Sequence, residues 1–182
     1  MAKANRPPIK VVPYDAAWPN VFAELKAALE PRLDGLALTI EHTGSTSIPG
    51  LAAKPIIDLI VVIATRDDLP AMINALAKLG YWHEGDLGIA GREAFAMEGP
   101  DVPRDGTGRR WPAQNLYVAA ADNAELRRHK AFRDYLRAHP DSIAAYARLK
   151  EDLAARFPHD IDSYSRSKTE FVEDILRRAR EA

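Results

Sequence analysis

One segment decides the fold prediction: Glu41-His42-Thr43-Gly44-Ser45-Thr46-Ser47-Ile48-Pro49-Gly50-Leu51-Ala52-Ala53-Lys54-Pro55-Ile56-Ile57-Asp58. It begins at the end of residues 36–43, where apolar side chains recur at every second position, as in a strand. Small turn-forming residues follow. The segment then enters a nearly unbroken β-branched run, residues 56–63, which is typical of a central strand covered on both faces. Two strands joined by a compact turn are therefore predicted, with one acid inside the second apolar run.

The rest of the chain alternates helices and strands before about residue 121 and is helical afterwards. Helices are predicted at about 17–33, 69–79, 122–138, 141–156 and 162–180, and further strands at 81–83, about 89–97 and 115–120. Residues 99–110 lack an apolar period and predict an exposed loop. The expected fold is an α/β or α+β chain with a mixed sheet flanked by helices. We expect a single domain over residues 1–182, with a sheet-containing core at about 9–120 and a helical C-terminal section at about 121–182.

Composition limits the function classes. The 182 residues include 47% hydrophobic residues and carry a formal net charge of −1, which argues against non-specific binding to nucleic acid or membranes. The absence of cysteine excludes disulfides and thiolate metal sites, and it fits a cytoplasmic protein. No apolar run reaches the roughly 18 residues of a spanning helix. Residues 1–8 have no apolar stretch after their basic residues, so we expect a short loose arm rather than a secretory signal.

The turn and the acid are the candidate site. Gly44, Ser45 and Thr46 can form a concavity of amides and hydroxyls that binds an anion, although Gly-Ser turns are common and the P-loop spacing is absent. Asp58 lies on a strand face with apolar neighbours, where an unpaired carboxylate would be costly. It is either a cation ligand or the partner of a basic residue such as Lys54. Lys54 could instead reach a phosphate.

Several other polar residues can be interpreted either as structural or as functional. His42, on the apolar face of its strand, is more typical of a satisfied core residue than of a catalytic base. Glu41 faces the other way and is expected to meet basic residues of the tail helices. Arg104, Arg109 and Arg110 form either a solvated charge cluster or a lid that grips phosphate. The basic residues of segment 122–138 are interspersed with acids and indicate a solvated helix face.

Motifs spread over nearly the whole chain resemble the GrpB (UPF0157) family, which is itself similar to the nucleotidyltransferase superfamily of DNA polymerase beta. The matching residues are Val12-Pro13-Tyr14-Asp15 with Trp18 and Phe22, Glu41-His42, Gly44-Ser45-Thr46, Pro49 to Asp58, Gly80-Tyr81, Phe132 to Arg137, Tyr146, Leu149-Lys150, Tyr164 and Lys168. The resemblance implies a nucleotidyltransferase-like mixed sheet in which the Gly-Ser turn lies opposite a metal-binding strand. Similar sequence also occurs as a module attached to some dephospho-CoA kinases.

The resemblance also implies ligands. The expected ligand is a nucleotide or another phosphorylated small molecule, held by Gly44, Ser45, Thr46, Lys54, Arg109, Lys150 and Lys168. Asp58 would be the catalytic residue and would hold Mg²⁺, and Glu93 is the candidate for the third acid of the nucleotidyltransferase set, from a neighbouring strand, and so for the second metal ligand of this chain.

Two departures from the nucleotidyltransferase pattern weaken a two-metal transfer. Ile60 stands where a second acid is usual on the metal-binding strand, and Tyr117 stands where the family often has histidine. Three functions therefore remain open. They are an Mg²⁺-dependent nucleotidyltransferase, a non-catalytic regulatory module that keeps the pocket, and a scaffold whose tail helices bind a protein.

Overall fold

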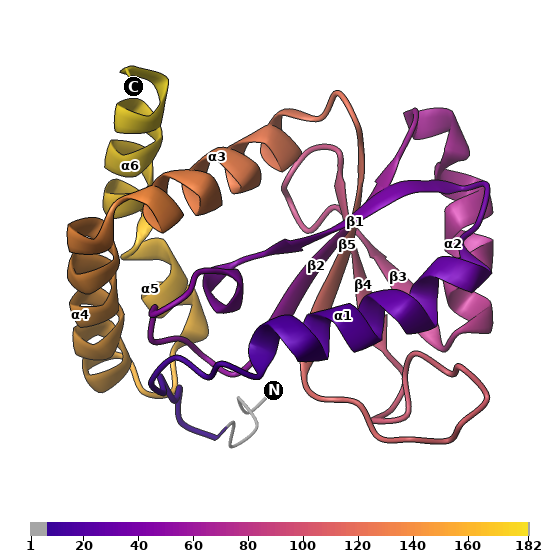
Figure 1. Ribbon diagram of the computed structural model, residues 1–182, viewed down its shortest axis with the longest axis horizontal. Coiled ribbons are helices and arrows are strands. Elements are labelled where there is room, and N and C mark those ends of the chain that lie inside the picture. Colours follow the sequence, from indigo (N-terminus) through magenta and orange to yellow (C-terminus); the bar gives the residue numbers. More distant parts are fainter. Residues whose placement is uncertain (1–6, 182) are drawn as a thin grey trace.

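The computed structural model describes residues 7–181, and the expected arm at residues 1–6 lies outside the described part of the chain. Its centre is a five-stranded sheet (Figure 1). The strands, in spatial order, are β1 (Ala37–Thr43), β2 (Ile57–Ile63), β5 (Gln114–Ala120), β4 (Arg92–Met97) and β3 (Tyr81–Gly85). β2 and β5 run parallel and the other neighbours run antiparallel. The predicted mixed sheet is therefore confirmed.

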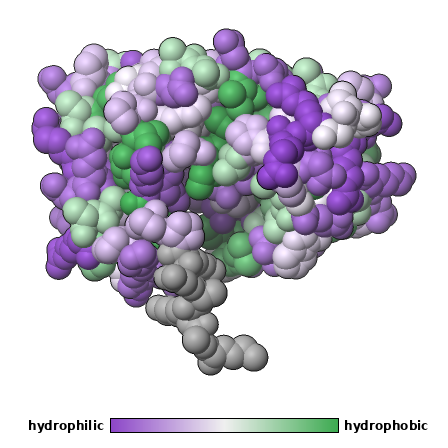
Figure 2. Space-filling model, turned by 90° about the horizontal axis from the view of Figure 1, so that it is seen from below, coloured by the Kyte–Doolittle hydropathy of each residue, from purple (hydrophilic) through white to green (hydrophobic). Residues whose placement is uncertain are grey.

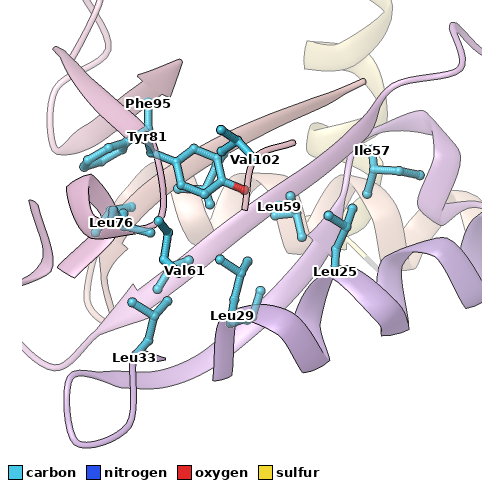
Figure 3. Packing of buried hydrophobic residues seen from close by; sticks show 14 of the residues in the cluster. Leu25, Leu29, Leu33, Ile57, Leu59, Val61, Leu76, Tyr81, Phe95 and Val102 are labelled. Carbon is cyan, nitrogen blue, oxygen red and sulfur yellow. The ribbon is translucent and has the colours of Figure 1, made fainter. Parts of the chain in front are cut away.

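One face of the sheet is covered by α1 (Trp18–Leu29) and α2 (Leu69–Lys78). Leu25 and Leu29 of α1 pack against Leu59 and Val61 of β2 in the main hydrophobic core (Figure 3). The leucines lie four residues apart, so they share one helix face, and the β2 residues lie two apart, so they share one strand face. Burial of these matching periodic stripes holds α1 on the sheet.

The opposite face receives the C-terminal helices. These are α3 (Ala124–Ala138), α4 (Pro140–Arg156), α5 (Ile161–Arg166) and α6 (Thr169–Glu181), and Figure 1 shows α4, α5 and α6 gathered at the end away from α2. Leu126 of α3 packs on Ile60 and Val62 of β2. A separate cluster joins the residues after the turn to these helices: Ile48, Leu51, Leu136, Tyr146 and Ile175. The helical section thereby packs directly against the segment singled out in the sequence.

Three local predictions are wrong. The single helix predicted at 162–180 is two helices, because α5 ends at Arg166 and α6 begins at Thr169. Serine side chains can bond the backbone outside a helix, and three of them occur between residues 163 and 167. Leu38 is 63% exposed because β1 has an irregular register between Ala37 and Thr39. The strand predicted from about residue 89 begins at Arg92, after a turn.

The surface is mainly polar. Hydrophilic side chains are spread over the face drawn in Figure 2, with apolar side chains interspersed among them. Among the described residues, no helix is both long and apolar enough to cross a membrane.

Candidate functional site

A cavity of about 300 Å³ opens where the end of β1 and the start of β2 meet the C-terminal helices. Residues from both halves of the chain line it: Gly44, Ser45, Thr46, Lys54, Ile56, Asp58, Asn115, Glu125, Arg128, His129, Phe132, Arg133, Tyr146, Lys150, Tyr164, Lys168 and Val172. The turn, the acid of β2 and basic residues of the helical section therefore share one solvent-reachable space.

The turn and the acid meet at Gly44. This glycine leaves β1 with φ of 65°, a left-handed conformation that residues with a Cβ rarely adopt. A Cβ placed on it would lie 2.0 Å from Oδ2 of Asp58, far inside van der Waals contact. The register of the sheet explains the approach, because Thr43 pairs with Asp58 across β1 and β2. Glycine is thus required here both for the backbone conformation and for room beside the carboxylate.

Two hydroxyls of the turn are used to hold its shape. Thr46 is buried, and its Oγ1 donates to the Ile56 carbonyl at 3.2 Å and lies 3.1 Å from Nε2 of His42. The Ser47 hydroxyl donates to the Gly44 carbonyl at 2.7 Å. Ser45, half-buried on the cavity wall, has its hydroxyl bonded to the phenol of Tyr146. Of the predicted phosphate-binding hydroxyls, Ser45 has the more accessible position, whereas Thr46 supports the turn.

His42 has the structural role that the sequence favoured. Its ring stacks on Phe22 with centroids 4.5 Å apart and planes 9° apart. Burial, together with the nearby charges of Arg137 and Arg133, lowers the His42 pKa to about 4. The imidazole is therefore neutral at physiological pH and serves as a packing and hydrogen-bonding group.

Asp58 is half-buried at the cavity wall and accepts a hydrogen bond of 2.7 Å from Nδ2 of Asn115, its neighbour on β5. The protein packed around the carboxylate raises its pKa, while Asn115 and the charges of His129, Lys54 and Lys168 act in the opposite direction. Within residues 7–181, no ion pair shorter than 4.0 Å joins Asp58 to Lys54. The lysines therefore act on Asp58 through space, and the carboxylate keeps one oxygen toward Gly44.

Three lysines reach the cavity from three separate segments. Lys54 precedes β2, Lys150 lies on α4 and Lys168 lies between α5 and α6. Lys150 is only 2% exposed, and its Nζ donates to the carbonyl of Ala52. Burial and then the charge of Lys168 lower its pKa to about 7. Burial and then the charge of Lys54 lower the pKa of Lys168 to about 8. These shifts follow from gathering like charges in a partly desolvated space.

Aromatic faces flank the lysines. Nζ of Lys150 lies 4.7 Å from the ring centre of Tyr146, and Nζ of Lys168 lies 4.4 Å from that of Tyr164. Lys54 approaches the same Tyr164 ring at 5.8 Å. A cation over an aromatic face is stabilised by the ring quadrupole, by roughly 0.5–1 kcal/mol at exposed sites and more when desolvated. The tyrosines thus hold the ammonium groups at the cavity wall.

Two arginines of α3 form hydrogen bonds with the end of β1 and with the turn. Nη1 of Arg133 donates to Oε2 of Glu41 at 2.9 Å and to the His42 carbonyl at 3.0 Å, and Arg137 donates twice to the Ser47 carbonyl. The predicted meeting of Glu41 with basic tail residues is confirmed. The prediction that the basic residues of this helix are exposed to solvent is wrong for Arg133, which is buried. The paired carboxylate and the carbonyl explain why burial of its guanidinium is tolerated.

Two predicted site residues lie elsewhere. Glu93 pairs with Val118 on β5, an odd number of residues from Asn115, so it points to the opposite face of the sheet from Asp58. There it bonds Arg66 at 2.9 Å and His83 at 2.7 Å. Glu93 therefore cannot be the second metal ligand beside Asp58, and that prediction is corrected.

Arg109 is also outside the cavity lining. Its guanidinium bonds Glu24 of α1 at 2.6 Å and stacks 3.9 Å from the ring centre of Trp111. The predicted phosphate-binding role of Arg109 is corrected for this conformation, in which the loop packs against α1 and not over the turn.

Four residues of the cavity lining were not predicted from the sequence. Glu125, Arg128, His129 and Phe132 of α3 all line the cavity. Their spacing of three and four residues places them on one helix face, which is the signal that could have found them. Charged residues at such positions were interpreted as solvent-facing because the sequence does not say what the helix packs against.

The donor set limits the metal that this site fits. No cluster of three or more His, Cys, Asp or Glu side chains able to hold a metal occurs among residues 7–181. Mg²⁺ usually binds through one or two carboxylates plus substrate phosphates and water. Asp58 fits that minimal arrangement as the protein carboxylate, whereas a cage made entirely of protein ligands does not fit.

Comparison with known proteins agrees with the fold. The model of the GrpB protein family matches residues 8–178. A UPF0157 protein of Pseudomonas aeruginosa is 40% identical over 173 residues, which cover 94% of this chain and 67% of that protein. The UPF0157 protein YqkA of Bacillus subtilis is 33% identical over 172 residues, and the matched region spans 47% of YqkA. This chain thus matches only part of these relatives' length.

Two solved structures and a dephospho-CoA kinase complete the comparison. The crystal structure of the conserved protein GrpB from Enterococcus faecalis has a TM-score of 0.80 at 34% identity, covering 94% of this chain and 98% of that one. A dephospho-CoA kinase of Mycolicibacterium paratuberculosis is 26% identical over 205 residues, which cover 96% of this chain and 46% of the kinase. Cid1 in complex with its short product ApU has a TM-score of 0.46 at 14% identity, too distant a likeness to support a functional inference. The match over residues 8–178 and the relatives at 33–40% identity show that this chain belongs to the GrpB family.

Proposed function

We propose that this protein binds the phosphate groups of a nucleotide in the cavity between the Gly44–Thr46 turn and helices α3 to α6. The observation that carries the proposal is the convergence of Lys54, Lys150 and Lys168 around Asp58. One carboxylate cannot neutralise three ammonium groups. An anionic ligand would supply the missing charge.

The electrostatics support this reading in two ways. Burial and the neighbouring lysine charges lower the pKa of Lys150 and of Lys168, so holding these like charges together is unfavourable in the free protein. A phosphate placed among them forms charge-assisted hydrogen bonds, which are roughly twice as strong as neutral ones. Arg128 and Arg133 also line the cavity, but their charges are paired with Glu173 and with Glu41 and Asp134, so the excess positive charge comes from the lysines. The second lining carboxylate among the described residues, Glu125, is turned toward Arg128 and His129 of its own helix.

Binding is better supported than two-metal transfer. Ile60 occupies the position of the second acid and is buried under α3, and Glu93 lies on the other face of the sheet. We therefore propose that Mg²⁺, where it takes part, is held by Asp58 together with phosphate oxygens of the ligand. The match to a dephospho-CoA kinase is consistent with a nucleotide-related role. These residues favour a protein that keeps the nucleotide pocket without two-metal transfer to a second molecule.

Titration calorimetry tests the proposal with ATP, ADP and AMP, each in Mg²⁺ and in EDTA. Lys168→Ala removes one of the three ammonium groups and should weaken binding at least about tenfold, which corresponds to about 1.4 kcal/mol. Lys78→Ala is the matched control, because Lys78 lies exposed on α2 far from the cavity lining. Equal affinity in wild type and Lys168→Ala, or no binding of any of these nucleotides by wild type, would reject the proposal.

A further inference from the structure

We propose that Lys150 is a nucleophile that takes up the nucleotidyl group of a bound nucleoside triphosphate and forms a covalent nucleotidyl-lysine. The inference rests on the proposed nucleotide binding and goes beyond it by assigning a chemical step to one side chain. It also supplies a role for a buried lysine that simple phosphate recognition does not require.

The position of Lys150 is the first argument. Lys150 is 2% exposed, yet it lines the cavity together with Ser45 and Asp58. Its Nζ is held in place by the Ala52 carbonyl and by the face of Tyr146. A phosphate-binding lysine is normally a flexible, hydrated point charge. A side-chain amine fixed within a buried wall is better suited to a reaction at one defined position.

The neighbours of Lys150 provide the second argument. Burial disfavours a positive charge on Lys150, and the charges of Lys168 and Lys54 in the same cavity act in the same direction. Desolvation beside another cationic group is a recognised way in which proteins make a lysine amine nucleophilic. Lys150 is the most buried of the three lysines, so it is the one that we assign as the nucleophile. Lys54 and Lys168 then remain to hold the phosphates.

The missing second acid is consistent with this chemistry. In two-metal transfer, one metal ion stabilises the attacking oxygen, and this requires a second carboxylate beside the first. A neutral amine needs no such activation, because its lone pair is already available. Ile60 in place of an acid therefore removes a group that this reaction does not use, whereas Asp58 remains.

The step balances as follows. The lone pair on Nζ of Lys150 forms a bond to the α-phosphorus of the triphosphate. The bond between that phosphorus and the oxygen bridging to the β-phosphate breaks, and its electron pair leaves with pyrophosphate. The proton displaced from Nζ passes to solvent in the cavity. The product is a phosphoramidate in which Lys150 carries a nucleoside monophosphate, and no oxidant or reductant is involved.

Labelling of the full chain tests the inference. The protein is incubated with Mg²⁺ and ATP or GTP labelled at either the α- or the γ-phosphate, then denatured and digested. We expect retained label from the α-position only, on the peptide that contains Lys150, with release of pyrophosphate in equal amount. The phosphoramidate should survive base and be lost in acid. Label on another residue, or retention of γ-label, would overturn the assignment.

Variants separate this step from binding. Lys150→Arg keeps a positive charge that cannot be removed at neutral pH, so it should abolish labelling. The matched control Lys78→Arg should label like wild type. Thermal melting shows which variants are folded, and the peptide assignment in wild type stands without any variant. Nucleotide binding by calorimetry without covalent label in wild type would reject the nucleophile and leave the proposed function intact. Absence of binding would reject both.

Discussion

The α-carbon of Gly44 lies directly against the carboxylate of Asp58, so that a methyl group on residue 44 would fall 2.0 Å from Oδ2 of the acid. This contact joins the turn to the acid of β2, and the two residues are 14 positions apart in the chain. It also fixes which oxygen of Asp58 is covered by the turn and which receives the Asn115 amide. The geometry of the candidate site therefore depends on the absence of a single side chain.

Gly44→Ala is expected to destabilise the protein and to abolish nucleotide binding. Gly50→Ala is a matched control, because Gly50 also has a positive φ but has no atom within 4 Å of an added Cβ. The left-handed backbone costs roughly 1–2 kcal/mol at both positions. Gly44→Ala additionally displaces Asp58, and such overpacking costs typically about 1–3 kcal/mol. Denaturant unfolding and calorimetry measure the difference. Equal losses in the two variants would contradict the close approach.

Asp58→Asn should remove the Mg²⁺-dependent part of nucleotide affinity. The amide keeps the size of the side chain but lacks the charge that Mg²⁺ prefers in its ligands. We expect at least about a tenfold loss in Mg²⁺, or about 1.4 kcal/mol. In EDTA the variant should bind at least as tightly as wild type, because a negative charge facing the phosphates has gone. Asp34→Asn, at an exposed position, is the control. Unchanged Mg²⁺ dependence in Asp58→Asn would exclude Asp58 as the metal ligand.

Anion affinity should fall as the pH rises. The pKa of Lys150 is lowered to about 7 and that of Lys168 to about 8, and a lysine is cationic below its pKa. Between about pH 6 and pH 9 both groups therefore lose charge, and an anion loses its partners. Sulfate is a suitable probe because its own charge is constant over this range. Thermal-shift titrations should give a dissociation constant that increases with pH, and Lys150→Met should show a smaller increase. A pH-independent affinity in wild type would contradict the shifted lysines.

Thr46→Val should loosen the turn without touching the cationic groups. The variant leaves the Ile56 carbonyl and the ring of His42 without the Thr46 hydroxyl. Leaving a buried polar group unsatisfied costs about 1–3 kcal/mol. Thr39→Val, at a half-buried position of β1, should change the free energy of unfolding by less than about 0.5 kcal/mol. Comparable effects of the two substitutions would argue against the structural role of Thr46.

Local sequence signals predicted the parts of the site that depend on neighbouring strands. Gly44 and Asp58 could be brought together because one turn joins the two strands; in the structure these strands pair antiparallel, with Thr43, the neighbour of Gly44, opposite Asp58. The fold class followed from the same alternation of strands and helices. The roles assigned to these residues as ligands of phosphate and Mg²⁺ remain predictions.

Positions that depend on tertiary packing could not be predicted in the same way. Periodicity shows that Glu93 lies on one face of β4, but only the pairing of β4 with β5 decides that this is the face opposite to Asp58. Arg109 could have closed over the turn, yet Glu24 and Trp111 hold it on α1. The burial of Arg133 required knowledge that α3 crosses behind Glu41. In each case a distant element determines where the charge lies.

Ile60→Asp would restore the paired acids of a two-metal site, and we expect it to fail. Ile60 is fully buried against Leu126 of α3, which covers this part of the sheet. A carboxylate there would be desolvated without a partner, and such a charge costs several kcal/mol. Ile60→Val is the control and should cost only about 0.5–1.5 kcal/mol. Denaturant unfolding should show the Asp variant to be largely unfolded or deeply destabilised, without gain of transfer activity. A stable Ile60→Asp protein that transfers nucleotides would contradict this expectation. It would show that α3 can move to make room for the carboxylate and that Asp58 is the remaining member of a pair of acids.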